Sequence, residues 1–292
     1  MRIEREVPLG RRTTLGAGGA AQAFATPTSV EELAAALRWA GEHELQVATV
    51  GLGSNLLVAD EGVSALVLRL GGELAGARVE GELLLAGGGA TNALCLHRAR
   101  EAGLGGFEFA CAIPGTAGGG VRMNAGAYGG DWASILRRAL VVDETGPHWL
   151  SPVELGLSYR RSALRPGQVV AEVEFRLERS SREQVKAKVA ELQALRKASQ
   201  PTNKRTFGSV FKNPEHELGA GRMLEACGLK GHRIGGAVIS RRHANFIENA
   251  GGARAADAIA LMAEARRRAR ERFGVVLEHE VVFLGPLELP PL

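Results

Sequence analysis

The sequence predicts an α+β protein, because strand-like and helix-like segments mix without the regular strand–helix–strand series of a parallel α/β fold. Short apolar segments of strand length crowd the first half of the chain, and the alternating run 169–177 indicates another strand. Amphipathic segments with helical spacing lie at 92–102, 183–196 and 255–272. No internal repeat organises these elements.

The first part of the chain holds a candidate phosphate cradle. A strand at 23–25 precedes a helix that opens at Pro27, where Thr28 or Ser29 can accept the capping hydrogen bond. The strand 46–50 then runs into Gly51-Leu52-Gly53-Ser54-Asn55, and further strands follow at 56–59 and 63–70. Because a strand follows the glycines, this is not the dinucleotide fingerprint, which needs a helix there. Two glycines with bare amides suit a phosphate, and a tight turn without a ligand is the alternative.

The middle of the chain holds its densest glycine region. After a strand at 83–86, Thr91 caps the helix 92–102, which ends at Gly103. The segment 113–130 then combines seven glycines with Thr116 and Asn124 as hydrogen-bond donors, so its backbone can approach a large flat ring such as a flavin. A merely flexible loop is the alternative, and the apolar Ile113, Val121 and Met123 argue against it. A hairpin is expected from strands 135–143 and 148–150.

The last part of the chain begins at the polar run 179–182 and continues with the helix 183–196. A serine-containing segment and a short helix around Met223 come next, followed by strands at 237–240 and 246–248, the helix 255–272 and closing strands at 275–277 and 281–283. We therefore expect three parts, residues 1–70, 71–179 and 180–292.

Composition excludes several classes of protein. With 292 residues, 45% hydrophobic and 23% charged, the chain is long enough to bury two or three modest cores. Its three cysteines are widely spaced, so we expect neither a disulfide framework nor a metal site. The charged start MRIEREVPLG does not resemble a signal peptide, and no apolar run is long enough to span a membrane, so a cytoplasmic protein is expected.

The net charge of +4 favours anionic partners. Phosphate-bearing small molecules satisfy that charge as well as nucleic acid does. The basic run 265–272 continues a helical pattern and lacks the aromatic residues that stack on bases, so we assign it to a solvated helix face and expect no nucleic acid.

The segment FGSVFKNP, residues 207–214, places one polar group in apolar surroundings. Ser209 lies between Gly208 and Val210, with Phe207 and Phe211 on either side. A hydroxyl excluded from water can give a proton to a carbanion beside it. The alternative is an ordinary strand residue ahead of the turn at 212–214.

Several short segments of the chain, taken in combination, resemble those of one family. Together with VGLGSNLLV near the start, the segments IPG, NAGAYG, YRRS and GSVFKNP, with HEV near the end, are similar to the UDP-N-acetylenolpyruvoylglucosamine reductases, the MurB family of peptidoglycan precursor synthesis. The likeness runs from Leu15 to about Gly285. It implies a two-part FAD-binding module of the PCMH/VAO-like type, in subdomains 1–70 and 71–179, and a smaller α+β substrate-binding domain.

The resemblance also implies a reaction and a set of residues. NADPH reduces a non-covalently bound FAD, which reduces the enolpyruvyl group of UDP-N-acetylglucosamine enolpyruvate to give UDP-N-acetylmuramate for the cell wall. The expected residues are Arg160, Ser209 and Glu280 for catalysis; Gly51, Gly53, Ser54, Asn55, Pro114, Gly115, Thr116, Gly119, Gly120, Asn124 and Gly126 for FAD; and Tyr128, Tyr159, Lys197 and Asn213 for substrate.

Two other functions share some of these features. A flavin oxidase or dehydrogenase of the wider group would carry the same FAD-binding module, although a covalently flavinylated relative would need His or Cys beside the first glycine loop, and 51–55 has neither. A phosphate-binding protein without catalysis would need only the glycine loops. Within the family this chain resembles the short-loop subtype, because only residues 164–168 separate the YRRS region from the next strand and no tyrosine follows Tyr159. A monomer is favoured.

Overall fold

The computed structural model describes residues 1–292, and the chain divides into two compact units. Unit 1 comprises Met1–Arg5, Ala23–Leu52 and Ala65–Arg196, and unit 2 comprises Glu6–Gln22, Gly53–Ser64 and Lys197–Leu292, so the chain crosses between them five times. Helices and strands mix in both units without a regular βαβ series, as the predicted α+β class requires. The three-part division 1–70, 71–179 and 180–292 stays a prediction about the cofactor and substrate modules.

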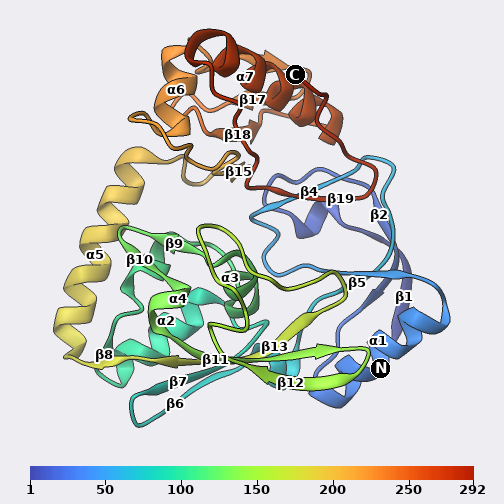
Figure 1. The fold of residues 1–292 in the computed structure, drawn as a ribbon, viewed down its shortest axis with the longest axis vertical. Helices are drawn as coiled ribbons and strands as arrows, with labels where there is room; N and C mark the ends of the chain where they lie inside the picture. Colours follow the sequence, from blue (N-terminus) through green and yellow to red (C-terminus); the bar gives the residue numbers. More distant parts are fainter. The chain divides into compact units, whose positions relative to one another are not determined.

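Unit 1 is built on a five-stranded antiparallel sheet. Its order is β12–β11–β13–β7–β6, and Figure 1 shows helices α2, α3 and α4 gathered on one side of it. The strands are β6 Ala77–Glu80, β7 Leu83–Gly87, β11 Leu136–Asp143, β12 Gly146–Leu150 and β13 Val169–Arg176. The predicted hairpin is therefore confirmed, with β11 and β12 joined by a tight turn at 144–145.

Strand β11 is buried on both faces, which accounts for its nearly continuous apolar sequence. Ala139 and Val141 join the core under α2 and α3, while Leu140 and Val142 join a second core with helix α1. The alternation expected in β13 fails at Glu174, whose side chain is only 11% exposed. Arg138 donates to this carboxylate at 2.6 Å, so the charge is paired where the pattern predicted a solvated position.

Helix α1, Val30–Glu42, packs beside the four-stranded sheet β1–β2–β5–β3. Its strands are β1 Ile3–Pro8, β2 Ala20–Ala25, β3 Gln46–Thr49 and β5 Val63–Leu68. The Ser29 hydroxyl accepts a hydrogen bond from the N–H of Glu32 at 3.3 Å, which confirms one of the two predicted caps. At α2, the predicted Thr91 cap is also confirmed, since its hydroxyl accepts from Leu94 N–H at 3.2 Å.

The other elements of unit 1 are short apart from α5, a long helix at its edge (Figure 1). They are η2 Gly72–Ala75, α2 Asn92–Glu101, β8 Leu104–Gly105, η3 Glu108–Ala112, α3 Ala117–Met123, β9 Gly126–Ala127, β10 Gly130–Asp131, α4 Trp132–Ile135, β14 Glu178–Arg179 and α5 Arg182–Ser199. Pairs β9–β10 and β8–β14 are antiparallel.

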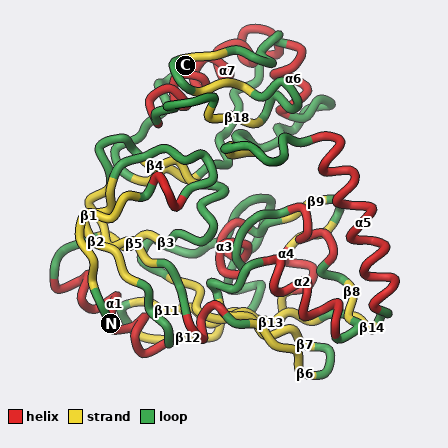
Figure 2. Tube along the Cα trace, turned by 180° about the vertical axis from the view of Figure 1, so that it is seen from behind, coloured by secondary structure: helices red, strands yellow, loops and turns green.

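Unit 2 packs two helices against a four-stranded antiparallel sheet, β15–β18–β17–β16 (Figure 2). Its elements are η1 Gly10–Arg12, β4 Leu56–Val58, β15 Thr206–Gly208, α6 Ala220–Ala226, β16 Arg233–Ile234, β17 Ala237–Ile239, β18 Phe246–Asn249, α7 Ala255–Phe273 and β19 Val282–Leu284. Strand β19 pairs in parallel with β4, which comes from near the start of the chain. Leu15 and Leu57 enter the same core as α7.

The predicted strand at 275–277 is wrong. Leu277 is buried but Val276 is 54% exposed, and this segment has no strand partner. A single bridge between Phe211 and His279 forms further along instead. The apolar sequence suggested a strand, but these residues are apolar because they pack on the core. Such packing does not require hydrogen bonds to a neighbouring strand. None of the helices combines the length and apolar character needed to cross a membrane.

Helix α7 begins against an acidic side chain from a distant loop. The two carboxylate oxygens of Asp60 accept hydrogen bonds from the N–H groups of Ala255 and Ala256, at 2.9 and 3.1 Å. These N–H groups have no acceptor inside the helix, and the helix dipole favours a negative charge at this end. Asp60 therefore fastens the loop after β4 to the helix that covers the unit 2 sheet.

Candidate functional site

The glycine-rich loop between β3 and β4 presents bare backbone N–H groups. Those of Gly51, Leu52 and Gly53 have no acceptor within the protein. In unit 1, a Cβ atom on Gly51 would lie 2.9 Å from Thr116 Cγ2 and Oγ1. In unit 2, Gly53 has a φ of +66°, and a Cβ there would overlap the carbonyl oxygen of Arg12. Both positions therefore require glycine, and N–H groups without an acceptor suit an anion.

The second glycine region contains a helix that the sequence did not predict. Helix α3 starts after Thr116, whose hydroxyl accepts from Gly119 N–H at 3.4 Å. A Cβ on Gly118 would lie 2.9 Å from Gly88 O, and one on Gly120 would overlap the Trp132 indole. These two glycines allow the helix to pack closely on its neighbours. Of the two expected cofactor residues here, Gly119 is exposed and Gly120 is buried.

The turn before α3 leaves polar groups available. The N–H groups of Gly115 and Thr116 have no acceptor within the protein. Beside them, the Nδ2 atom of Asn92 donates to Ile113 O at 2.8 Å, whereas its buried Oδ1 atom has no partner. A buried acceptor without a donor is costly, so this turn is suited to a polar ligand.

Asn124 holds three loops together through its side chain. Its Nδ2 atom donates to Asp131 Oδ2 at 3.3 Å and to Ser158 O at 3.0 Å, and its Oδ1 atom accepts from Ala133 N–H at 2.9 Å. An amide nitrogen has two hydrogens, and both are used. Asn124 therefore uses its side-chain hydrogens within unit 1, and its assignment to the cofactor stays a prediction.

Arg160 is held on the loop that Asn124 shapes. Its Nη2 atom donates to Gly126 O at 2.6 Å and its Nη1 atom approaches Asn124 O at 3.5 Å. The guanidinium also lies over the Tyr159 ring, 5.0 Å from the ring centre. These contacts orient a permanently charged, fork-shaped donor group at a fixed place in unit 1.

The two expected substrate-binding tyrosines of unit 1 are open to solvent. Tyr128 is 44% exposed and Tyr159 is 53% exposed. Arg196 lies near Tyr128, and burial lowers the pKa of its guanidinium below the usual value while the tyrosine acts in the opposite direction. The short loop 164–168 is fixed by Arg122, whose guanidinium donates to the carbonyl groups of Leu164 and Gln168. Nothing in this loop supplies a further aromatic side chain.

In unit 2, Ser209 follows the end of β15 and is half-buried. Its neighbours Phe207, Val210 and Phe211 are each no more than 2% exposed, which confirms the apolar surroundings expected from the sequence. A Cβ on Gly208 would lie 2.6 Å from the Phe246 ring, so the residue before the serine is glycine because an aromatic ring lies against its backbone.

Glu280 lies beside this serine segment, although the two are far apart in the sequence. The N–H of Glu280 donates to Val210 O at 2.8 Å, and Glu280 O accepts from Asn55 Nδ2 at 3.0 Å. Glu280 is thereby hydrogen-bonded both to Val210, the residue after Ser209, and to Asn55 of the first glycine loop. Two of the three expected catalytic residues and one expected cofactor residue therefore meet within unit 2.

The remaining expected substrate residues of unit 2 have different environments. Lys197 is exposed near the end of α5. Asn213 has a structural contact, since its Oδ1 atom accepts from the N–H of Ala220 at 3.0 Å and so caps α6. Lys212, between the serine and Asn213, donates to Glu278 at 2.7 Å.

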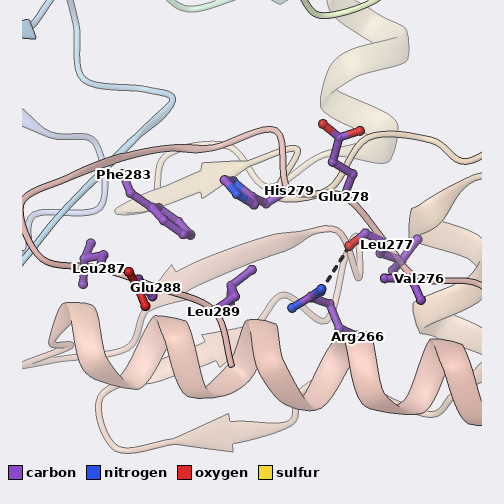
Figure 3. Close-up of a pocket in the computed structure, with 9 residues that line it drawn as sticks. All are labelled: Arg266, Val276, Leu277, Glu278, His279, Phe283, Leu287, Glu288 and Leu289. Atoms are coloured by element: carbon purple, nitrogen blue, oxygen red, sulfur yellow. Dashed lines mark hydrogen bonds between the residues drawn. The ribbon is translucent and has the colours of Figure 1, made fainter. Parts of the chain in front are cut away.

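Two open pockets of unit 2 are not lined by the expected catalytic residues. One, of about 490 Å³, lies between α7 and the C-terminal segment (Figure 3), and its lining residues are Arg266, Val276, Leu277, Glu278, His279, Phe283, Leu287, Glu288 and Leu289. In it Arg266 donates to Leu277 O at 3.2 Å, and His279 stacks on Phe283 at 4.4 Å. This pocket lies where the C-terminal segment packs on α7, and it contains none of the expected catalytic residues. The candidate site is therefore located by hydrogen-bonding groups and not by the volume of a pocket.

Known proteins match both parts of the chain. Residues 200–284 match the model of the UDP-N-acetylenolpyruvoylglucosamine reductase C-terminal domain, and residues 21–149 match that of an FAD binding domain. UDP-N-acetylenolpyruvoylglucosamine reductase 2 of Symbiobacterium thermophilum is 45% identical over 97% of this chain and 92% of its own length. The Rubrobacter xylanophilus reductase is 44% identical over 95% and 94%. The crystal structure of the Thermus caldophilus enzyme (MurB) superposes with a TM-score of 0.85 at 39% identity, covering 97% and 99%.

The chain belongs to the UDP-N-acetylenolpyruvoylglucosamine reductase family. It is an FAD-dependent oxidoreductase, and the FAD-binding fold expected from the sequence is confirmed. The residues of the two glycine regions fit this cofactor. The backbone N–H groups at 51–53 and 115–116 have no acceptor within the protein, and a diphosphate and a ring with carbonyl groups both need such donors. The roles of individual residues stay predictions.

Sequence reasoning gave no role to Asn245, which contacts the segment that contains Ser209. Asn245 is 2% exposed and its amide bonds to both backbone groups of Phe211, two residues after Ser209. Nothing in the local pattern HANF distinguishes such a residue from a turn asparagine. Asn245 directly precedes β18, and its position beside the segment that contains Ser209 becomes apparent only when the pairing of β18 with β15 is known.

Proposed function

We propose that this chain reduces the enolpyruvyl group of UDP-N-acetylglucosamine enolpyruvate to UDP-N-acetylmuramate, with NADPH as the electron donor. Membership of the reductase family supports the reaction. The observation that supports the residue assignment most directly is the hydrogen bond from Glu280 N–H to Val210 O, because it joins the backbone of Glu280 to the backbone of the residue after Ser209.

The cofactor would be held non-covalently by backbone groups. We assign its diphosphate to the amides of Gly51, Gly53, Ser54 and Asn55, and its ring system to 114–120 and 124–126. When bound, FAD supplies the hydride chemistry, accepting a hydride from NADPH and passing it to C3 of the enolpyruvyl group. Fixed glycine amides offer donors that need no rearrangement when negative charge approaches.

Arg160 would bind the carboxylate of the enolpyruvyl group. Hydride arrival at C3 leaves negative charge at C2 that is conjugated with this carboxylate, so the site must stabilise an enolate-like species as it forms. A guanidinium remains charged and presents paired donors to a carboxylate. Its contacts with Gly126 O and Tyr159 would keep it oriented before the substrate arrives.

Ser209 would give its proton to C2 and complete the reduction. The burial of Phe207 and Phe211 supports this role, because exclusion of water prevents competing proton exchange and strengthens nearby polar interactions. Glu280 would hold the protonated enol form or orient its partners, and its backbone bond to Val210 fixes the distance between the two segments.

The substrate's diphosphate and sugar would be bound by Tyr128, Tyr159, Lys197 and Asn213. The exposed Tyr128 and Tyr159 side chains remain accessible to a ligand, as does the ammonium group of Lys197. No membrane or nucleic-acid partner is needed for this chemistry. A short loop at 164–168, fixed by Arg122, leaves closure over the substrate to groups other than a capping tyrosine.

Stopped-flow absorbance of the Ser209→Ala variant tests the proposal. Flavin reduction by NADPH should stay near the wild-type rate, whereas reoxidation by the enolpyruvyl substrate should slow by about 10²- to 10⁴-fold, as expected for a lost general acid. The exposed Ser64 of the same unit gives a matched control, Ser64→Ala, which should leave both half-reactions unchanged. If Ser209→Ala slows only the NADPH step, the proposal is contradicted. It is also contradicted if the reduced flavin of the wild type is reoxidised by oxygen but not by the enolpyruvyl substrate.

A further inference from the structure

Asn245 makes hydrogen bonds to the two residues that follow Ser209, Val210 and Phe211. Its Oδ1 atom accepts from Phe211 N–H at 2.9 Å, and its Nδ2 atom donates to Phe211 O at 2.8 Å. Its own carbonyl oxygen accepts from Val210 N–H at 2.9 Å. Three bonds from one buried residue therefore hold the two residues that follow the serine.

These bonds replace strand pairing at the point where it stops. The ladder between β15 and β18 runs Thr206↔Glu248, Phe207↔Ile247 and Gly208↔Phe246. In this register Ser209 would face Asn245, but the bond to Asn245 O comes from Val210 instead. Ser209 therefore lies at a break in the ladder, as in a bulge, and such breaks re-aim a side chain.

The serine is fixed from both directions along the chain. Before it, Gly208 is held in the ladder and leaves no room for a side chain against Phe246 and Asn245 O. After it, Val210 is bonded through its N–H to Asn245 and through its carbonyl group to Glu280. Asn245 bonds to Val210 through its backbone carbonyl group and to Phe211 through its side-chain amide, so a substitution removes only the two bonds to Phe211.

The chemistry of this position demands an amide. A side-chain amide carries one acceptor and one donor at a spacing that matches a peptide group, so it can satisfy both backbone groups of Phe211 at once. An aspartate can accept from the N–H but cannot donate to the carbonyl group, and both groups are buried.

We infer that Asn245 is a positioning residue that sets where the Ser209 hydroxyl lies, and that it thereby controls the proton-transfer half of the reaction. This inference rests on the proposed role of Ser209. A displacement of about 1 Å between reacting groups can slow a step by about 10²-fold. Asn245 is expected to influence only the step that uses Ser209, whereas a purely structural residue would lower stability without selecting between the half-reactions.

The test compares Asn245→Asp and Asn245→Ser with the same changes at Asn249. Asn249 is a fair control because its amide also makes buried-segment contacts in unit 2, donating to Leu15 O at 3.0 Å and accepting from Gly251 N–H at 3.0 Å. In stopped flow, Asn245→Asp should reduce its flavin with NADPH at the wild-type rate and slow reoxidation by substrate by about 10- to 100-fold, with an increased solvent isotope effect. The Asn249 variants should lower the melting temperature and leave the ratio of the two rates unchanged.

Two further measurements separate the failure of this inference from failure of the proposed function. In a Ser209→Ala background, Asn245→Asp should cause no additional slowing, because the group it positions is gone. A crystal structure of Asn245→Asp should show the Ser209 hydroxyl displaced, and Asn245→Ser provides the same readouts if the aspartate variant does not fold. If Ser209→Ala leaves reoxidation fast, the proposed function fails. If Ser209→Ala slows reoxidation but both Asn245 variants reoxidise fast, the positioning role of Asn245 is wrong. The positioning role is also wrong if the Asn245 variants slow both half-reactions equally.

Discussion

Replacing Gly53 by alanine should weaken FAD binding much more than it weakens the fold. Gly53 has a φ of +66°, and an added Cβ would overlap the carbonyl oxygen of Arg12 and lie 2.7 Å from Thr13 Cα. The obstruction is backbone, which cannot swing aside as a flexible side chain can. The Gly53 carbonyl group also accepts from Thr14 N–H at 3.1 Å, so the loop must break this bond to make room.

The expected loss of affinity follows from these contacts. A left-handed residue with a Cβ costs about 1–2 kcal/mol, and a lost hydrogen bond adds about 1 kcal/mol. If the displaced loop must return to its original path to bind the diphosphate, roughly 2 kcal/mol or more appears as binding free energy. This corresponds to a rise in the Kd for FAD of about 30-fold or more.

Quenching of flavin fluorescence, titrated against the apoprotein, measures this Kd. Gly81→Ala is the matched control, because Gly81 has a φ of +62° and no atom within 4 Å of the added Cβ. This variant carries the same backbone strain without the collision and should bind FAD as the wild type does. Equal affinities for Gly53→Ala and the wild type would refute the assignment of this loop to the cofactor.

Three further outcomes are expected. Acid precipitation should release all flavin into the supernatant, whereas colour retained on the chain would contradict non-covalent binding. Lys197→Ala should raise KM for the UDP-sugar by the equivalent of about 1.5–3 kcal/mol through loss of a charge-assisted contact, and an unchanged KM would make Lys197 a surface residue. Hydrogen bonds from Arg267 and Arg268 hold the pKa of Glu264 at about 2, below its usual 4.5, so this carboxylate stabilises the fold above pH 4.5 and loses that effect as pH falls toward 2. Glu264→Gln should therefore flatten the fall in melting temperature over this range, and an unchanged acid slope would refute the linkage.

Much of the secondary structure was predictable because it depends on short-range patterns. Ser29 and Thr91 cap their helices as expected, since the capping hydrogen bond needs only residues within one turn. The failures depend on distant partners. The segment 275–277 packs on a core without a ladder, Glu174 is buried beside two arginines, and α3 forms from a glycine-rich sequence that local propensity disfavours.

The site divides in the same way. The serine's apolar surroundings follow from residues that are its neighbours in the sequence, whereas glycine is required at 51 and 53 because Thr116 and Arg12, which are distant in the sequence, lie against these positions. The links from Glu280 to Val210 and to Asn55, and the amide of Asn245 against Phe211, join segments separated by tens to hundreds of residues. No local pattern encodes such pairs, so only family resemblance connected Ser209 with Glu280 before the fold was known.

The parallel pairing of β4 with β19 has a consequence for synthesis of the chain. Leu56 lies beside Val282, so the strand that follows the first glycine loop gains its partner only when almost the whole polypeptide has been made. Leu15, Leu57 and Asp60 likewise lack their partners until α7, residues 255–273, has been made. A chain that ends before residue 282 therefore lacks the strand that pairs with β4.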